Sequence, residues 1–257
     1  MPKRAHVALI RELTERVAAQ GTRARAAQER RYLKSDLEFL GAGMPVIRRE
    51  AKALSRRDPD LSRAGLKALV SALWETRVHE LRAIAIGLLE QRTDLLRKAD
   101  AAFLIGLVRD SKTWAYVDWL ATKVLGALLV REPTLQAALV RWAKDPDFWV
   151  RRTALLALHD PLLQGRGNFE LFARLAVPML GDKEFFIRKA IGWVLRSTSR
   201  RTPELTRAFV AAHARELSGL SFGEAIKHLP ANQQQALREL ASVRRSQLGS
   251  CARRPLI

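Results

Sequence analysis

The sequence is poor in cysteine and has no long apolar run. Its 257 residues include one cysteine, Cys251, which excludes an internal disulfide and any zinc or iron–sulfur site built from several cysteines. No stretch approaches the roughly 20 apolar residues that a membrane-spanning helix needs. The start of the chain shows neither an apolar signal core nor a small-residue cleavage site, so we expect a cytoplasmic protein, associated with the nucleoid if its source is bacterial.

Sequence signatures of metal binding, nucleotide hydrolysis and covalent catalysis by lysine are missing as well. The five histidines are scattered, without the paired helical spacing of metal ligands, so we predict no metal site. The glycine pairs at 41–43 and 165–167 lack the preceding strand and the Lys-Ser/Thr of a phosphate loop, which argues against nucleotide hydrolysis. No lysine stands out as a Schiff-base nucleophile. The sequence therefore predicts a protein without a metal or cofactor.

Acidic residues are far fewer than basic ones. Lysine and arginine together number 45 against 26 for aspartate and glutamate, which gives a net charge of +19. This excess goes beyond what solubility requires and favours a polyanionic partner, with nucleic acid ahead of a membrane surface. A merely solvated basic surface is the remaining alternative. A hydrophobic content of 48% excludes general disorder.

Helical periodicity runs through almost the whole chain, and no alternating run bounded by turns predicts a strand. The sequence thus predicts an all-α protein, with a single repeat domain at 1–246 and a flexible tail at 247–257. One helix is expected at 4–20, a second after Gly21-Thr22, and a third from Pro45. Further helices are predicted at 61–74, 78–91, 94–109, 114–131, 134–143, 147–159, 168–180, 184–197, 203–216, 222–228 and 231–246.

An internal repeat organises these helices. The segment 145–155, DPDFWVRRTAL, aligns with 182–192, DKEFFIRKAIG, at an offset of 37 residues. Looser copies place Leu81, Val117, Val150 and Ile187 at equivalent positions, 36, 33 and 37 residues apart. A two-helix period near 40 with an acid before the second helix resembles HEAT-like repeats. Such repeats stack into a curved solenoid, whose aligned cations would form a basic concave face for DNA.

The segment 111–120, SKTWAYVDWL, is unusual. If it is helical, Trp114 and Asp118 share one face, so a large aromatic ring and a carboxylate project side by side. By itself this pair is more simply read as a helix-surface contact than as a catalytic site. Bulky residues also fill the space between repeats, and this role is expected for Trp74, Trp119, Trp142 and Trp149.

Several motifs between about residues 30 and 230 resemble, in order, the AlkD-type DNA alkylation repair glycosylases. They are Tyr32-Leu33-Lys34, Phe39-Leu40-Gly41, Lys112-Thr113-Trp114 with Val117-Asp118, Trp149-Val150-Arg151-Arg152, KEFFIRKAIGWVLR at 183–196 and EAIKH at 224–228. The resemblance implies a HEAT-like solenoid that binds duplex DNA and removes N3- and N7-alkylated purines that carry a positive charge. The family is understood to act without enclosing the base.

The resemblance also implies roles for single residues. Asp118 matches the catalytic aspartate, and Trp114 and Trp193 match two tryptophans that contact the DNA backbone beside the lesion. Arg152 matches an arginine of the same cleft, and Tyr32 matches a tyrosine near it. Further candidates for contacts with the DNA backbone are Lys112, Arg151, Arg188 and Lys189. The sequence departs from the family beside Trp114, at Ala115-Tyr116.

These residue types suit cleavage of an N-glycosidic bond. Cleavage builds positive charge on the sugar, which an ionised carboxylate stabilises and the face of an indole ring attracts. We expect a monofunctional DNA glycosylase that acts as a monomer on duplex DNA containing alkylated purines, with neither membrane nor metal as a partner. The competing interpretation is a non-catalytic HEAT-like module that binds DNA or an acidic protein through the same basic face.

Overall fold

The computed structural model describes the backbone of residues 3–251 and the side chains of residues 6–242. Within these residues no β-strand occurs, apart from one isolated bridge between Glu38 and Val78. The all-α prediction is confirmed, and the helix pairs are consistent with a helical-repeat fold. The chain divides into two compact units, Met1–Val124 and Leu125–Ile257. No described helix combines the length and the apolar character needed to cross a membrane.

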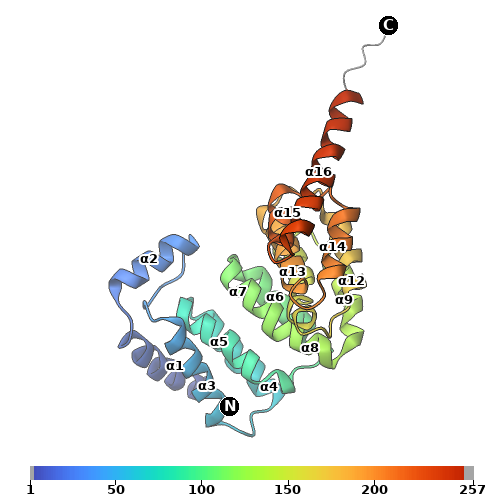
Figure 1. Ribbon diagram of the computed structural model, residues 1–257. Helices are drawn as coiled ribbons and strands as arrows, with labels where there is room; N and C mark the ends of the chain where they lie inside the picture. The colour runs from blue at the N-terminus through green and yellow to red at the C-terminus, as the bar shows by residue number, and fades with distance from the viewer. Residues whose placement is uncertain (1–2, 252–257) are drawn as a thin grey trace. The chain divides into compact units, whose positions relative to one another are not determined.

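The first unit, blue to green in Figure 1, carries the N-terminal helices. Its α-helices are α1 Lys3–Ala18, α2 Arg23–Leu33, α3 Met44–Arg57, α4 Arg63–Glu75, α5 His79–Gln91, α6 Ala101–Ser111 and α7 Trp114–Trp119. Helix α5 packs against both α3 and α4. Fully buried aliphatic side chains, Leu66, Leu73 and Ile84 among them, fill the space between these helices. A π-helical turn, Leu120–Leu125, follows α7.

The second unit, green to red in Figure 1, holds the remaining helices. They are α8 Gly126–Arg131, α9 Gln136–Trp142, α10 Phe148–Leu156, α11 His159–Leu163, α12 Phe169–Ala176, α13 Phe185–Thr198, α14 Pro203–Ala212, α15 Gly219–Ile226 and α16 Ala231–Cys251. Helix α13 is central, since it packs against α10, α11, α14 and α15. Gly192 makes room for α15, because a Cβ atom at this position would lie 2.7 Å from the Cβ atom of Glu224.

The repeat read from the sequence has a structural counterpart. The acids at its start cap helices: the Asp147 side chain accepts from the Trp149 N–H at 2.8 Å, and Glu184 accepts from Phe186 in the same way. Capping satisfies backbone donors that the first helical turn leaves unpaired. The four register positions, Leu81, Val117, Val150 and Ile187, are each 0% exposed. The repeated aliphatic positions are therefore core positions.

Helix ends differ from the prediction where buried acids or prolines intervene. The helix predicted at 94–109 begins only at Ala101, after two 3-10 turns, Thr93–Leu95 and Lys98–Asp100. The buried Asp100 carboxylate accepts from the Arg97 N–H at 2.9 Å and stabilises the second of these turns. The helix predicted at 147–159 ends at Leu156. Pro161 has no N–H to bond to the carbonyl of residue 157, and its ring clashes with that carbonyl, so a continuous helix is interrupted before it.

At the C-terminus, α16 continues to Cys251 rather than ending at 246. The remainder of the tail predicted at 247–257, residues 252–257, lies outside the described residues. The assignment of 1–246 to a single domain stays a prediction.

Candidate functional site

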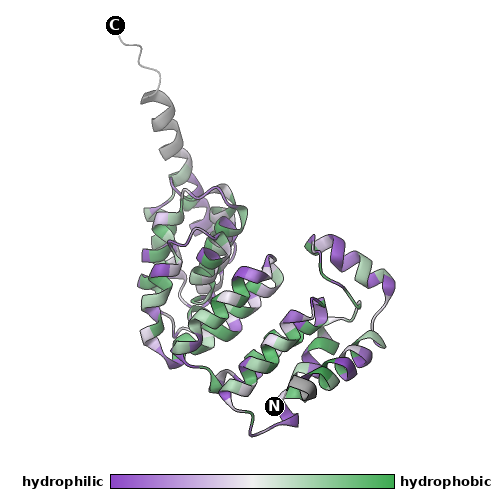
Figure 2. Ribbon diagram, turned by 180° about the vertical axis from the view of Figure 1, so that it is seen from behind, coloured by the Kyte–Doolittle hydropathy of each residue, from purple (hydrophilic) through white to green (hydrophobic). Residues whose placement is uncertain are grey.

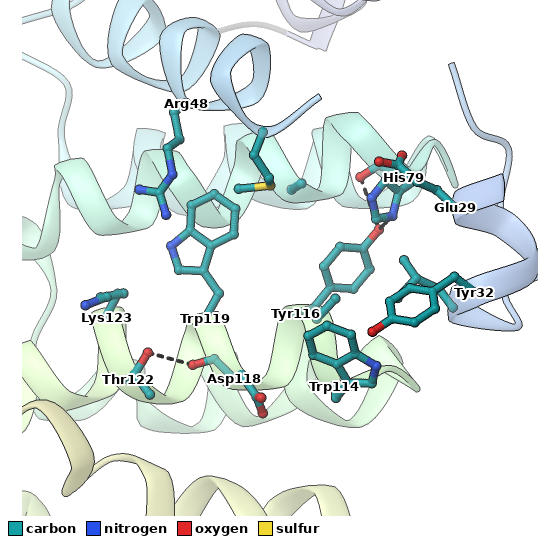
Figure 3. A pocket seen from close by; sticks show the side chains of 14 residues that line it. Glu29, Tyr32, Arg48, His79, Trp114, Tyr116, Asp118, Trp119, Thr122 and Lys123 are labelled. Carbon is teal, nitrogen blue, oxygen red and sulfur yellow. Dashed lines mark hydrogen bonds between the residues drawn. The ribbon is translucent and has the colours of Figure 1, made fainter. Parts of the chain in front are cut away.

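Helix α7 carries the Trp114 and Asp118 pair. Lys112 ends α6 in the left-handed region, at φ 47°, and the Thr113 side chain caps α7 by accepting from the Ala115 N–H. Trp114 is thus the first helical residue, and Asp118 lies one turn later. Figure 3 shows both side chains projecting to the same side of α7. Both are half-buried, and the Thr122 hydroxyl donates to the backbone carbonyl of Asp118 at 2.8 Å.

A pocket of about 410 Å³ adjoins this pair within the first unit. Helices α2, α3, α5 and α7 and the π-helical turn after α7 supply its lining. The residues are Glu29, Tyr32, Leu33, Met44, Arg48, His79, Ala83, Trp114, Ala115, Tyr116, Asp118, Trp119, Thr122 and Lys123. Its volume falls in the range of about 300–1,000 Å³ typical of sites for small molecules. Three of the residues predicted for the site, Tyr32, Trp114 and Asp118, therefore line one cavity.

The loop after α2 is anchored on a buried carboxylate. Glu80 is 0% exposed and accepts from the backbone N–H groups of Leu40, Gly41 and Ala42 at 3.0, 2.6 and 3.1 Å. Burial raises the pKa of Glu80, while these hydrogen bonds act in the opposite direction. Gly41 has φ 78°, and a Cβ there would lie 2.1 Å from the Thr22 carbonyl oxygen, so the turn requires glycine. This anchor ties the loop between α2 and α3 to α5.

Helix α2 contributes side chains to the pocket although it buries none of its residues. In Figure 2 it is predominantly hydrophilic and stands apart from α3 and α5. Tyr32, at 69% exposure, extends from α2. Its ring meets that of Trp114 edge-on, with centroids 5.9 Å apart and planes at 87°. The predicted tyrosine therefore contacts the predicted tryptophan.

A neutral hydrogen-bonded pair forms one end of the pocket. The hydroxyl of the buried Tyr116 lies 2.6 Å from His79 Nδ1 and also donates to the His79 carbonyl at 3.1 Å. The His79 ring stacks on Phe39, with centroids 4.5 Å apart. Burial lowers the pKa of His79 to about 4 and raises that of Tyr116, so both are uncharged at neutral pH. Tyr116 thus joins α7 to α5, and the His79 ring in turn contacts Phe39 in the loop after α2.

Trp119, which was expected to fill the core or the space between repeats, is half-buried and lines the pocket. Its indole N–H donates to Glu90 at 2.7 Å, which pulls the ring toward α5. The Arg48 guanidinium lies 5.1 Å from the ring centroid, a distance suited to a cation–π contact. A Cβ atom at Gly87 of α5 would lie 3.5 Å from the Trp119 ring, so Trp119 packs between α7 and α5, as expected of a residue between repeats. Trp74 and Trp149 are buried, also as expected.

Trp193 and Arg152 belong to the second unit. Trp193, on α13, is half-buried and packs against the His159 ring with centroids 4.5 Å apart. His159 Nδ1 lies 2.7 Å from Asp160 Oδ1, and its Nε2 lies 2.8 Å from the Ser197 hydroxyl. Arg152, on α10, is 2% exposed. It donates to the Phe186 carbonyl, and its guanidinium lies 5.6 Å from the Phe186 ring centroid.

The other predicted cations differ in their surroundings. Arg151 pairs with Asp182 at 3.1 Å, and Arg188 donates to the Asp182 carbonyl at 2.7 Å. Lys189 pairs with Glu224 at 2.8 Å. Lys112 is exposed. Arg151 and Lys189 therefore link neighbouring repeats of the second unit, whereas Arg188 bonds within its own repeat.

Residues 13–229 match the sequence profile of the DNA alkylation repair enzyme family. The chain belongs to this family. A solved structure described as a predicted DNA alkylation repair enzyme from Enterococcus faecalis has the same fold, with a TM-score of 0.71 and 24% sequence identity. The similarity covers 82% of this chain and 98% of that one. None of the curated proteins compared with the sequence matches it.

In this member of the DNA alkylation repair enzyme family, Tyr32, Trp114 and Asp118 meet at one pocket. Arg152 and Trp193 lie on α10 and α13, which pack against each other. The meeting of all these residues in a single cleft stays a prediction. Among the described residues, no group of three or more His, Cys, Asp or Glu side chains is arranged to hold a metal ion.

Several pocket residues of this DNA alkylation repair enzyme could not be predicted from the sequence. Glu29, Met44, Arg48 and His79 come from three helices that lie outside the aligned repeat copies at 145–155 and 182–192. His159 had a usable signal, because it lies 34 residues before Trp193 and 38 before Ser197, close to one repeat length in each case.

Proposed function

We propose that this protein is a monofunctional DNA glycosylase that hydrolyses the N-glycosidic bond of cationic alkylated purines in duplex DNA. The observation that supports this most strongly is the placement of Asp118 beside Trp114, on one face of α7, at the edge of an aromatic pocket. The family match supplies the context of DNA alkylation repair. An N3- or N7-alkylpurine of the 3-methyladenine or 7-methylguanine type is the substrate.

The reaction replaces the base with water. The C1′–N bond breaks first, both of its electrons go to the base, and the positively charged purine leaves as a neutral molecule. The deoxyribose becomes an oxocarbenium-like cation. Water adds its oxygen to C1′ and loses a proton to the surrounding solvent. Asp118 stabilises the sugar cation through its negative charge and orients the attacking water. No amine nucleophile takes part, so the DNA strand stays intact.

The remaining residues position the DNA. The Trp114 ring, steadied by Tyr32, offers an aromatic face to the sugar, and the face of such a ring attracts a developing cation by about 1 kcal/mol. Trp193 acts from the second unit on the backbone beside the lesion, and Arg152, which is 2% exposed, joins α10 to the Phe186 carbonyl of α13. The net charge of +19 supplies the general attraction to duplex DNA, and this attraction weakens as salt is added. The protein acts as a monomer.

The test is release of bases from methylated duplex DNA. Wild type should release 3-methyladenine and 7-methylguanine, whereas Asp118→Asn should lose most of this activity while it still binds DNA. Asp60→Asn, an exposed change between α3 and α4, is the matched control and should behave as wild type. Equal release by wild type and Asp118→Asn would remove Asp118 from the mechanism. Binding of DNA without any release by wild type would favour the non-catalytic module.

Substrate range gives a second arm to this test. A cationic purine is already a good leaving group, so the protein need supply only modest stabilisation. Uracil and ethenoadenine are neutral and should be released far more slowly than 7-methylguanine. Excision of neutral bases at the same rate would contradict a mechanism that depends on charge.

A further inference from the structure

Three arginines of helix α2 have no carboxylate partner among the residues that the structure describes. Arg23, Arg30 and Arg31 are all exposed, and none of their guanidinium groups forms an ion pair or a hydrogen bond within that part of the chain. Arg25, on the same helix, is different, because it pairs with Glu29 at 2.8 Å. The three arginines are therefore available to an anion outside the protein.

The stability of α2 does not explain these arginines. The helix buries none of its residues, and an isolated helix of this length is marginal in water. Its first turn holds Arg23 and Arg25 but no acid, although a cation near a helix N-terminus is unfavourable. Arg30 and Arg31 lie in the last turn, which favours cations, yet they are adjacent and repel each other. A bound anion would remove both costs.

The arginines share one side of α2. Arg23 and Arg30 are seven residues apart, which is close to two full turns, and Arg31 lies beside Arg30 on the same side. The side chains of α2 that line the pocket project from another side. Ala24 and Ala27 lie between the arginines and are exposed. This side of the helix therefore has cations at both ends and small side chains between them, so an extended anion can approach the backbone closely.

We propose that this arginine face of α2, formed by Arg23, Arg30 and Arg31, binds phosphates of the DNA duplex beside the lesion. The inference rests on the proposed function and assigns it a phosphate-binding surface. Two turns of helix separate Arg23 from Arg30 by about 10 Å along the axis, which spans about three phosphates of one DNA strand. A guanidinium group also matches a phosphate geometrically, through two parallel N–H···O bonds.

DNA is favoured over an acidic protein as the partner for two reasons. The chain belongs to a family of DNA alkylation repair enzymes, and a DNA strand presents anions at the regular spacing that the arginine face requires. The face is also connected to the candidate site. Tyr32 follows Arg31 on α2, and its ring meets that of Trp114 with centroids 5.9 Å apart. Phosphate binding would hold α2, and with it the Tyr32 ring, against Trp114. The arginines are positioning residues and take no part in bond cleavage.

The experiment measures binding of an unmodified DNA duplex by fluorescence anisotropy over a series of salt concentrations. The test variant combines Arg23→Gln, Arg30→Gln and Arg31→Gln. The matched control removes the same charge from exposed arginines on α1, α3 and α12, which also have no ion pair among the described residues: Arg11→Gln, Arg56→Gln and Arg174→Gln.

The test variant should lose affinity by at least about tenfold at 0.1 M salt, and its slope of log affinity against log salt should become shallower by about 2.7 if all three arginines bind phosphate. The control should change the slope by less than about 0.9, the value for one contact. Equal slopes in the two variants would overturn the inference. The melting temperature of the test variant should not fall, because the arginines do not stabilise α2; a clear fall would assign them a structural role instead.

Unmodified DNA makes this test independent of catalysis. Loss of affinity in the test variant, together with no excision by wild type, would support the arginine face and overturn the proposed function. Excision by wild type with unchanged DNA binding in the test variant would overturn the inference alone.

Hydrogen exchange on wild type provides a measurement that needs no variant. The amides of α2 should exchange readily in the free protein, because the helix buries no residue. A saturating duplex should slow their exchange by about tenfold or more, whereas the amides of α14 should change little. Unchanged exchange in α2 would overturn the inference. Slowing by vesicles that contain phosphatidylserine, but not by DNA, would overturn the assignment to DNA.

Discussion

The imidazole of His159 lies against the indole of Trp193, with ring centroids 4.5 Å apart and planes inclined by 53°. Asp160 and Ser197 bind the two ring nitrogens of His159 at 2.7 and 2.8 Å, so the imidazole cannot rotate without breaking both contacts. The order Asp–His–Ser resembles that of a hydrolase triad. Ser197, however, is 7% exposed and lies inside α13, where no substrate can reach its hydroxyl. The three residues position Trp193.

His159→Phe keeps an aromatic ring beside Trp193 and removes both hydrogen bonds. We expect a stability loss of about 1–3 kcal/mol, because the buried Ser197 hydroxyl loses a partner. We also expect a lower kcat/KM for release of 7-methylguanine, because the Trp193 ring is less fixed. A double-mutant cycle with Trp193→Ala separates the two effects. If His159→Phe lowers activity equally with and without Trp193, the residue acts only through stability.

Lys112 offers a case in which stability and DNA affinity should change in opposite directions. The residue is exposed and has φ 47°, a left-handed conformation that costs a side-chain-bearing residue about 1–2 kcal/mol and glycine almost nothing. Lys112→Gly should therefore raise the free energy of unfolding by about 1 kcal/mol. If Lys112 binds phosphate, the slope of log affinity against log salt should become shallower by about 0.9.

Lys34→Gly is the matched control for that substitution, since Lys34 is also exposed, ends α2, and has φ 49°. It should give a similar gain in stability. An equal loss of DNA affinity in both variants would indicate a general effect of charge, and an unchanged salt slope in Lys112→Gly would remove Lys112 from the DNA contacts.

The repeat in the sequence predicted the fold well for a physical reason. A position that is buried in each copy must be apolar in each copy, so Val150 and Ile187 could be matched by composition alone and are both fully buried. The acids that open each copy also have a local role, since the Asp147 side chain caps the helix that begins one residue later. Features that depend on residues near each other in the sequence could therefore be predicted from it.

Partners from the next repeat could not be read in this way. Arg151 and Lys189 looked like cations available to DNA, yet each meets a carboxylate more than 30 residues away, Asp182 and Glu224 respectively. The pocket is a similar case, because it needs α2 placed beside α7 by the loop anchored on Glu80. Local patterns do not encode such long-range pairings, so the sequence located Asp118 and Trp114 but not the cavity that they border.

A substitution at Glu224 tests whether Lys189 links α13 to α15 or is available to bind DNA. It binds both Lys189, at 2.8 Å, and Arg196. Burial raises the pKa of Glu224, but Lys189, Arg196 and Lys227 together more than reverse this, and the pKa lies below its ordinary value. Glu224→Gln removes the negative charge and releases both cations. We expect tighter binding to duplex DNA with a steeper salt slope, and a small loss of stability, about 1 kcal/mol or less.

Lys189→Gln is the comparison for that measurement. If Lys189 braces α13 against α15, its loss should reduce stability slightly and leave DNA affinity almost unchanged. A large loss of affinity in Lys189→Gln, together with no gain in Glu224→Gln, would show that Lys189 already binds phosphate in the native protein.

His79 should make the protein sensitive to acid. Burial lowers its pKa from about 6.5 in the unfolded chain to about 4 in the folded protein. Between these values the unfolded state binds a proton that the folded state does not, so stability is present at neutral pH and is lost as the pH falls through this window. The loss attributable to His79 at pH 5 is about 2 kcal/mol.

His79→Phe tests this, because Tyr116 can still donate to the backbone carbonyl of residue 79. Glu80 acts in the opposite direction: burial raises its pKa, so its protonation favours the folded state as the pH falls. That contribution is common to wild type and variant and cancels in their difference. Urea unfolding at pH 7 and pH 5 should show a steeper loss for wild type than for His79→Phe. Equal slopes would mean that His79 is protonated in the folded protein, and the neutral pair that closes this end of the pocket would then be wrong.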